Sequence, residues 1–326
     1  MRRRALLTAS LAAGTLAAGA GARAQAPDRI FRLGHLMLAA QVDRAPGDYL
    51  LPQLESHGFV AGRNLVAISR AGPPETLPAL AQELLAARPD VVVTAGFLAT
   101  RAMVDASRNV PIVMTVPDPV ASGFAASLAR PGGNVTGVAN LVVDLQPKRF
   151  ELLVQAVPQA RRIGVLTQKA AGPFAGPGGE RIFRDAAAAT GVELAIVDAE
   201  GATDYPSAFV ALRAAGVDAL LIASALPFIT DAMQLARLAL EARLPTSCEF
   251  AVMAREGCLM AYGPDRTELR RRMAAQVARV LRGAAPGEIP IEQPTLFELV
   301  VNLRTARALG ITLPPTMVAR ADEVIE

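Results

Sequence analysis

Short apolar runs alternate with longer amphipathic segments along most of the chain. The runs at 90–94 (DVVVT), 112–116 (IVMTV) and 218–223 (DALLIA) are rich in β-branched and other apolar residues, as is typical of strands buried in a parallel sheet. The segments between such runs, for example 97–107, have the length and spacing of helices. This alternation predicts an α/β fold in which helices cover both faces of a parallel sheet.

The alternation runs through the chain twice, in two similar halves. In the first half we expect strands at 30–38, 64–70, 90–94, 112–116 and 135–140 and helices at 48–57, 76–87 and 97–107. In the second half we expect strands at 162–167, 192–198, 218–223, 245–248, 258–262 and 295–301 and helices at 147–156, 179–190, 204–214, 227–242, 266–281 and 303–309. The pattern therefore predicts two three-layer α/β/α lobes with parallel sheets.

Three strand-like bridges join the predicted lobes, at 136–142, 261–265 and 297–302. They divide the chain into a first lobe of residues 27–139 plus 263–296 and a second lobe of residues 140–262 plus 297–326. Short crossings between two similar lobes form a hinge, and the cleft between the lobes is then the expected ligand site.

The stretch 112–140 contains the most informative polar position of the first lobe. Asp118 lies between two prolines directly after a predicted strand, so its carboxylate stands at the carboxyl end of the sheet. Ser122 is placed to cap a predicted helix at 123–129, and the residues at 131–134 (PGGN) predict a turn. A carboxylate at this position suggests a ligand contact, and a turn aspartate is the structural alternative.

The first residues read as a secretory signal peptide. Arginines at 2–4 precede an Ala/Leu-rich apolar segment, and small residues around 22–26 offer a cleavage site, so we expect residues 1–26 to be removed on export. The arginine pair is compatible with Sec or twin-arginine export. No cysteine lies near the cleavage site, which excludes lipid attachment there. The predicted location is the periplasm.

The basic charge of the chain does not indicate nucleic-acid binding. The chain has a net charge of +3 and a pI near 9.2, but its first 24 residues hold four arginines and no acidic residue. The remainder has 29 basic and 30 acidic side chains, a net charge of −1. We interpret the arginines of 266–281 as a solvated helix face rather than a nucleic-acid stripe.

The two cysteines leave two interpretations open. Cys248 and Cys258 are close enough in sequence to form a disulfide in an oxidising compartment, or they are two buried apolar thiols. Two cysteines and two histidines without ligand spacing do not predict a metal site, and no cofactor is expected.

A series of short motifs runs in order along essentially the whole mature chain. It consists of 111–113 (PIV), 118–120 (DPV), 130–138 (RPGGNVTGV), 148–153 (KRFELL), 261–264 (AYGP), 293–295 (QPT), 297–300 (FELV), 308–310 (ALG) and 321–325 (ADEVI). This ordered series resembles the tryptophan/phenylalanine-binding (TrpX-like) family of bacterial ABC-transporter substrate-binding proteins. The resemblance implies a type I periplasmic-binding fold, export, and delivery of a small solute to an ABC permease and its ATPase.

The resemblance also places candidate ligand-binding residues on the walls of the cleft. They are Met37, Leu38, Thr94, Gly96, Phe97, Asp118, Asn140, Gln168, Leu226, Glu249 and Tyr262. Asp118 matches the family pattern, whereas Gly96-Phe97-Leu98 stands where members often have Gly-Thr-Pro, and Cys248-Glu249 where an aromatic is common. These departures predict a pocket less polar than the usual amino-acid site.

Structural alternatives accompany several of these candidates. Gln168 is otherwise an exposed strand-end residue, and Glu249 a carboxylate at a helix N-terminus. Tyr262 otherwise packs in the hinge. The free N–H groups that open the helix at Gly96 and Phe97 are suited to a carboxylate, with a tight turn as the alternative.

The function predicted from these observations is that of an exported, monomeric solute-binding protein without enzymatic activity. No nucleophile motif, ordered catalytic triad or metal-ligand set is present in the sequence. A periplasmic sensor subunit that presents the solute to a receptor is the alternative, and a doubly wound α/β enzyme is a more distant one. The expected solute is an amino acid or an aromatic or apolar organic acid, because Phe97 and Leu226 supply apolar surface.

Overall fold

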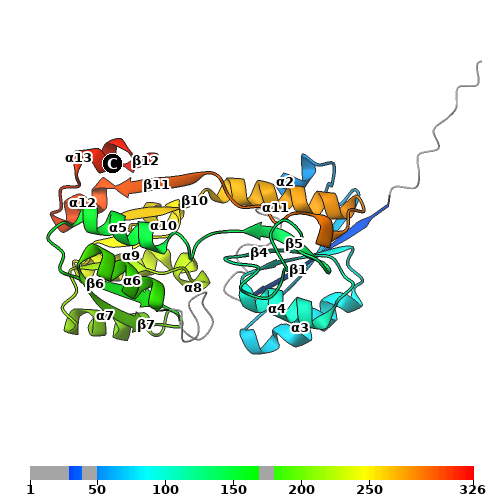
Figure 1. Cartoon of the computed structure of the whole chain (residues 1–326), viewed down its shortest axis with the longest axis horizontal. Coiled ribbons are helices and arrows are strands. Elements are labelled where there is room, and N and C mark those ends of the chain that lie inside the picture. Colours follow the sequence, from blue (N-terminus) through cyan, green and yellow to red (C-terminus); the bar gives the residue numbers. More distant parts are fainter. Residues whose placement is uncertain (1–28, 39–49, 169–179) are drawn as a thin grey trace, which may run out of the picture.

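A computed structural model of the protein describes residues 29–38, 50–168 and 180–326. The predicted signal peptide, residues 1–26, lies outside the described residues. Two lobes stand side by side in Figure 1, with β1–β5 in the right-hand lobe and β6–β12 in the left-hand lobe. We call them lobe 1 and lobe 2.

Lobe 1 is built on a five-stranded parallel sheet with the order β2-β1-β3-β4-β5. Its strands are β1 (Phe31–Leu38), β2 (Leu65–Gly72), β3 (Val91–Ala95), β4 (Ile112–Val116) and β5 (Val135–Ala139). Its helices are α2 (Leu51–Glu55), α3 (Leu77–Ala86), α4 (Phe97–Ala106) and α11 (Arg266–Leu281), with short 3-10 turns η2 (Pro74–Thr76) and η3 (Pro286–Glu288). Helices α3 and α4 pack on one face, and α2 and α11 on the other.

Lobe 2 is built on a seven-stranded sheet with the order β12-β11-β10-β9-β8-β6-β7. Its strands are β6 (Arg162–Thr167), β7 (Glu193–Asp198), β8 (Ala219–Ile222), β9 (Thr246–Cys248), β10 (Met260–Pro264), β11 (Phe297–Asn302) and β12 (Glu323–Ile325). Its helices are α5 (Gln146–Ala156), α6 (Arg181–Thr190), α7 (Tyr205–Ala214), α8 (Leu226–Thr230), α9 (Ala232–Glu241), α10 (Ala251–Arg255), α12 (Leu303–Leu309) and α13 (Pro315–Ala319). Helices α7 to α10 pack on one face, and α5, α6, α12 and α13 on the other.

The two lobes confirm the predicted α/β class, with one difference in strand direction. Strands β10 and β11 are antiparallel, whereas the prediction had only parallel strands. The reason is the path of the chain, because β10 leads out of lobe 2 into α11 of lobe 1 and β11 leads back beside it. A strand that returns next to the one that left must run in the opposite direction.

Two predicted helices differ from the observed ones. Residues 123–129 form turns, because the N–H groups of Phe124 and Ala125 both bond to the carbonyl oxygen of Pro119, a pattern that does not continue into a helix. The predicted helix at 227–242 is two helices, α8 and α9, which meet at Asp231. The Tyr205 hydroxyl donates to the Asp231 carboxylate over 2.8 Å at this break.

Three crossings connect the lobes, after β5, after β10 and before β11. Glu292 pairs with β5, the strand that leads into the first crossing, since its N–H donates to the Gly137 carbonyl over 3.0 Å and its carbonyl accepts from the Ala139 N–H over 2.9 Å. The second and third crossings are joined by a bond of 3.0 Å from the Asp265 N–H to the Leu296 carbonyl. The crossings thus lie side by side and form one hinge.

Candidate functional site

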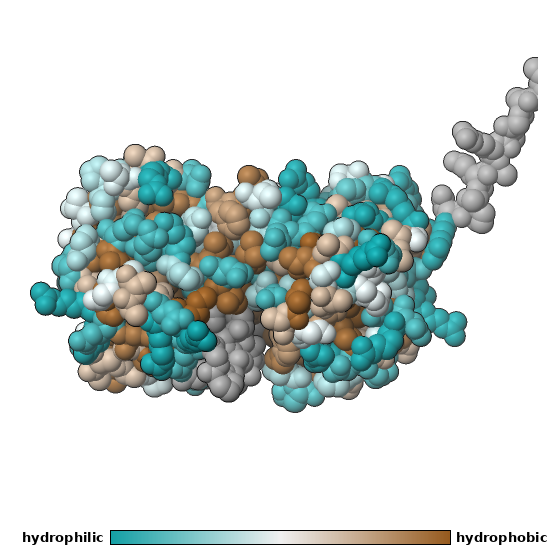
Figure 2. Space-filling view, viewed as in Figure 1, coloured by the Kyte–Doolittle hydropathy of each residue, from teal (hydrophilic) through white to brown (hydrophobic). Residues whose placement is uncertain are grey.

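A cleft of about 610 Å³ lies between the two lobes and is lined by residues of both. This volume is within the range of small-molecule sites. Figure 2 shows apolar side chains gathered where the lobes face one another. Ten of the eleven predicted ligand residues line this cleft: Met37, Leu38, Thr94, Gly96, Phe97, Asp118, Asn140, Gln168, Leu226 and Glu249.

Phe97 is the main aromatic surface on the lobe 1 wall. Gly96 begins α4 with φ of +81°, a conformation that favours glycine, and this turn directs Phe97 to the cleft. Phe97 is 40% exposed, and the Arg101 guanidinium lies 5.4 Å from the centroid of its ring. Thr94 also lines the cleft, and its hydroxyl oxygen lies 2.8 Å from that of Thr100. The wall thus presents a supported aromatic face.

Asp118 stands at the cleft edge and also holds its own turn. Its Oδ1 accepts the N–H groups of Val120 and Ala121, each over 2.9 Å. This is the turn role that the sequence offered as the alternative. The contacts observed for this carboxylate in the described residues use Oδ1 alone, so Oδ2 remains able to accept from a solute.

The lobe 2 wall meets lobe 1 at Leu226. A Cβ atom on Gly96 would lie 3.8 Å from Leu226 Cδ1, so the two lobes approach each other here. Gln168 lines the cleft at the end of β6, and its Nε2 donates to the Glu200 carbonyl over 3.3 Å. Asn140 lines the cleft from the first crossing.

Glu249 belongs to a buried polar cluster behind the lobe 2 wall. The cluster consists of Gln146 and Arg149 from α5, Ser224 after β8, and Glu249 after β9, and each is at least 96% buried. Burial raises the pKa of Glu249, while the charge of Arg149 and a hydrogen bond from Ser224 act against the rise. Burial lowers the pKa of Arg149 to about 10, so the guanidinium is charged at neutral pH.

The neighbouring backbone fixes the position of Glu249. A Cβ atom at Gly263 of β10 would lie only 2.1 Å from the Glu249 carbonyl oxygen, so glycine is required for this close approach. Cys248 immediately before it forms a disulfide with Cys258, which is the first of the two interpretations left open by the sequence. The structure therefore places Glu249 between the end of β9 and Phe250, the N-cap residue of α10, with its backbone held by the close approach of Gly263.

Tyr262 is the one predicted site residue that the cleft does not include. Its ring stacks on that of Phe297, with centroids 6.5 Å apart, where β10 and β11 pair. This is the hinge-packing role that the sequence offered as the alternative to ligand stacking.

Several cleft residues were not predicted as site residues, including His35, Asp144, Ser224, Arg266 and Arg270. The last two correct the interpretation of α11 as a simple solvated face, because its first turns face the cleft and place Arg266 5.2 Å from the ring centroid of Phe250 in lobe 2. The sequence indicated their role only by placing Arg266 and Arg270 four residues apart, on one face of a helix that directly follows a crossing. Burial lowers the pKa of His35 to about 4, which leaves its imidazole neutral at physiological pH.

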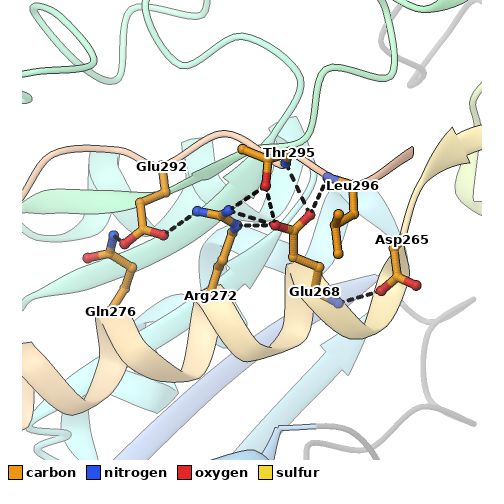
Figure 3. Close-up of polar contacts among 7 residues, drawn as sticks. All are labelled: Asp265, Glu268, Arg272, Gln276, Glu292, Thr295 and Leu296. Carbon is orange, nitrogen blue, oxygen red and sulfur yellow. Dashed lines mark hydrogen bonds and ion pairs between the residues drawn. The ribbon is translucent and has the colours of Figure 1, made fainter. Parts of the chain in front are cut away.

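A second charged cluster holds the hinge (Figure 3). Glu268 of α11 accepts from the N–H groups of Thr295 and Leu296 over 3.1 and 2.9 Å, and from Arg272 over 2.6 Å. Arg272 also donates to Glu292 over 2.8 Å. Burial opposes the ionisation of Glu268, but the Arg272 guanidinium and the two N–H groups outweigh it and hold its pKa at about 2. The cluster ties α11 to the third crossing.

Neither a metal-binding cluster nor a membrane span is found in the described part of the chain. No group of three or more His, Cys, Asp or Glu residues within it is placed to hold a metal ion. None of its helices has the length and apolar character needed to cross a membrane.

Two lobes, a hinge of three crossings and a cleft between the lobes define the class of two-lobed solute-binding proteins. Residues 54–325 match the family model for ABC transporter substrate binding protein, so the chain belongs to that family. The family resemblance seen in the sequence is confirmed.

Similar proteins support the same assignment. The chain is 25% identical over 292 residues to the tyrosine-binding protein of Clostridioides difficile (strain R20291), covering 86% of this chain and 80% of that protein. A conserved domain protein from Vibrio cholerae has a TM-score of 0.80 at 25% identity, covering 91% of this chain and all of its own. A domain from Streptococcus pneumonia in complex with L-Trp has a TM-score of 0.75 at 21% identity, covering 90% and 100%.

Proposed function

We propose that this protein is the exported solute receptor of an ABC importer, which captures a small solute in the cleft and delivers it to a membrane permease and ATPase. The single observation that carries the proposal is the cleft itself, because residues of both lobes line it around one hinge. A solute that contacts both walls favours the closed state, which alone offers both sets of contacts. The permease then distinguishes the closed form from the open one.

The lining supports a solute with an apolar or aromatic part and a polar head. Phe97, Leu226 and Phe250 offer apolar surface, while carboxylates and arginines stand at the cleft edges. Relatives named as tyrosine-binding or bound to L-Trp support the same class. The predicted N-terminal signal peptide and the family support export to the periplasm.

A thermal-shift screen of amino acids, aromatic acids and sugars tests the proposal. We expect aromatic amino acids or aromatic acids to raise the melting temperature and sugars to leave it unchanged. Small-angle X-ray scattering of the same samples should then show a smaller radius of gyration with the bound solute, because the lobes close. Stabilisation by sugars alone would contradict the solute class, and an unchanged radius of gyration would contradict closure.

A charge contact between Asp118 and the solute can be tested separately from the hydrogen bonds that Asp118 makes within its turn. Asp118→Asn keeps an oxygen that accepts the Val120 and Ala121 N–H groups but removes the charge. Asp118→Ala removes both. If Asp118 contacts the solute through its charge, both variants weaken binding roughly tenfold while only the alanine variant loses stability. Equal affinity of wild type and Asp118→Asn, measured by calorimetry, would leave Asp118 with the turn role alone.

A further inference from the structure

The buried cluster behind the lobe 2 wall has both donors and acceptors left over. Within the part of the chain that the structure describes, four of its buried atoms lack a hydrogen-bond partner: Gln146 Oε1, Arg149 Nε, Arg149 Nη1 and Glu249 Oε2. Unpaired buried polar atoms cost free energy, so a cluster with four of them indicates a role other than stability.

The cluster connects a buried cation to a cleft-lining carboxylate through one hydroxyl. Arg149 Nη2 lies 3.5 Å from Ser224 Oγ, and Gln146 Nε2 lies 3.3 Å from the same oxygen. With these two N–H groups donating, the Ser224 proton is left to donate to Glu249. Arg149 of α5 also donates to the carbonyl oxygen of Val142, which lies on the first crossing. This bond fixes the position of the guanidinium.

Arg149 does not line the cleft, whereas Ser224 and Glu249 do. A solute therefore meets the carboxylate and never the guanidinium. The charge of Arg149 favours the ionised form of Glu249, and the Oε2 atom of that carboxylate has no hydrogen-bond donor among the described residues.

Resting on the proposed function, we propose that Glu249 is the cation subsite of the cleft, and that Arg149 is a positioning residue that favours the ionised form of Glu249 against its burial, both by its charge and through Ser224. The substrate class is then a solute whose polar head carries an ammonium or a comparable cationic group. Asp118 is less suited to this task, because its Oδ1 already serves its own turn.

Few other charged groups face Glu249. Arg266 of α11 acts on it from lobe 1 in the same direction as Arg149. Strand β10 presents Gly263, which does not titrate. Asp118, Asp144 and Arg270 line the same cleft. The pH dependence of cation binding is therefore expected to report Glu249, with Arg149 as its buried partner.

Calorimetric titration with three probes between pH 5 and 8.5 tests the subsite. L-phenylalanine carries both charges, phenethylamine only the ammonium, and 3-phenylpropionate only the carboxylate. We expect the two ammonium probes to bind at least tenfold more tightly than 3-phenylpropionate, with affinity rising with pH as Glu249 ionises. Glu249→Gln should remove this advantage and its pH dependence.

Three further variants test the positioning role. Arg149→Met removes the charge, Arg149→Lys keeps a charge in a different shape, and Ser224→Ala removes the connecting hydroxyl while leaving Arg149 in place. The midpoint of the affinity–pH curve should move to higher pH in the methionine and alanine variants and return toward wild type in the lysine variant. Carbon-13 NMR of the Glu249 carboxyl, assigned with Glu249→Gln, should show the same order without any ligand.

Each outcome decides the proposal. Identical Glu249 midpoints in wild type, Arg149→Met and Ser224→Ala would overturn the positioning role. Failure of both ammonium probes to bind, or equal binding of 3-phenylpropionate, would overturn the cation subsite. The proposed function fails separately, if the broader solute screen gives no stabilisation at all. The ligand-free carboxyl titration does not depend on that screen.

Discussion

The two charged clusters differ in burial and in how far their charged groups are paired, since Arg272 and Glu292 of the hinge are partly exposed whereas Arg149 and Glu249 of the cleft wall are buried. In the hinge, both Glu268 oxygens accept hydrogen bonds, and Arg272 donates to Glu268, Glu292 and Thr295. In the cleft wall, Arg149 and Glu249 are joined only through Ser224 and keep unpaired atoms. A fully satisfied polar cluster rigidifies and specifies a structure, whereas each unsatisfied buried group calls for a further explanation.

The pKa shifts of the two glutamates have opposite directions, although burial acts on both carboxyls in the same direction. Both are buried, and burial alone disfavours the carboxylate. Direct donors reverse the effect at Glu268 and hold its pKa at about 2, while at Glu249 the charge of Arg149 and the Ser224 hydroxyl do not outweigh burial and the pKa is raised. Protein stability should therefore respond to the two residues with opposite signs.

The largest expected effect is the loss of the hinge carboxylate. Glu268→Gln should lower the free energy of unfolding by about 3 kcal/mol at pH 7, because it leaves a half-buried Arg272 short of a partner. Urea denaturation measures this. The control is Glu241→Gln, which breaks the exposed pair with Arg237 and should cost about 0.5 kcal/mol or less. Equal losses in the two variants would remove the distinction between a complete buried cluster and a surface pair.

Lowering the pH should remove the stabilising contribution of the Glu268 carboxylate. The folded pKa of Glu268, about 2, lies below its ordinary value of 4.5, so its contribution is present above pH 4.5 and is lost as pH falls toward 2. The contribution is about 3 kcal/mol at order-of-magnitude precision. A plot of the free energy of unfolding of wild type against pH should therefore fall between pH 4.5 and 2, and the plot for Glu268→Gln should be flatter there. Parallel curves would contradict the shift.

Reduction of the Cys248–Cys258 disulfide should loosen the cleft wall and leave the hinge cluster in place. Because the bridged cysteines are 10 residues apart, we expect a loss of about 2 to 3 kcal/mol on reduction. Unfolding with and without reductant measures it, with Cys248→Ser/Cys258→Ser as the control that should not respond. A response of the control would assign the effect to the reductant.

The smallest expected effect is that of Glu249→Gln on stability. Because burial favours the protonated form of Glu249, an amide of the same shape should change the free energy of unfolding by about 1 kcal/mol or less at pH 6. The folded pKa is raised, so wild type loses stability as pH rises above 4.5, and the variant should gain relative to it. A loss as large as that of Glu268→Gln would show that the cleft cluster is structural.

The sequence by itself determined the class of fold and the composition of the cleft. Buried strands are recognisable from dense apolar runs, and the carboxyl ends of parallel strands meet at one edge, so Thr94, Phe97 and Asp118 were placed together correctly. Ten predicted residues line the cleft for this reason. Whether they bind the solute stays a prediction.

The tertiary structure decided which polar groups are satisfied. Arg149 lies within a helix whose sequence (KRFELL) matches the family, but only the packed structure shows that its guanidinium is buried beside Ser224, 75 residues further along. Glu268 likewise meets Thr295 across 27 residues. Local patterns determine strands and helices through periodicity, whereas hydrogen bonds between distant segments depend on how those elements pack, and so do the pKa values of Glu249 and Glu268.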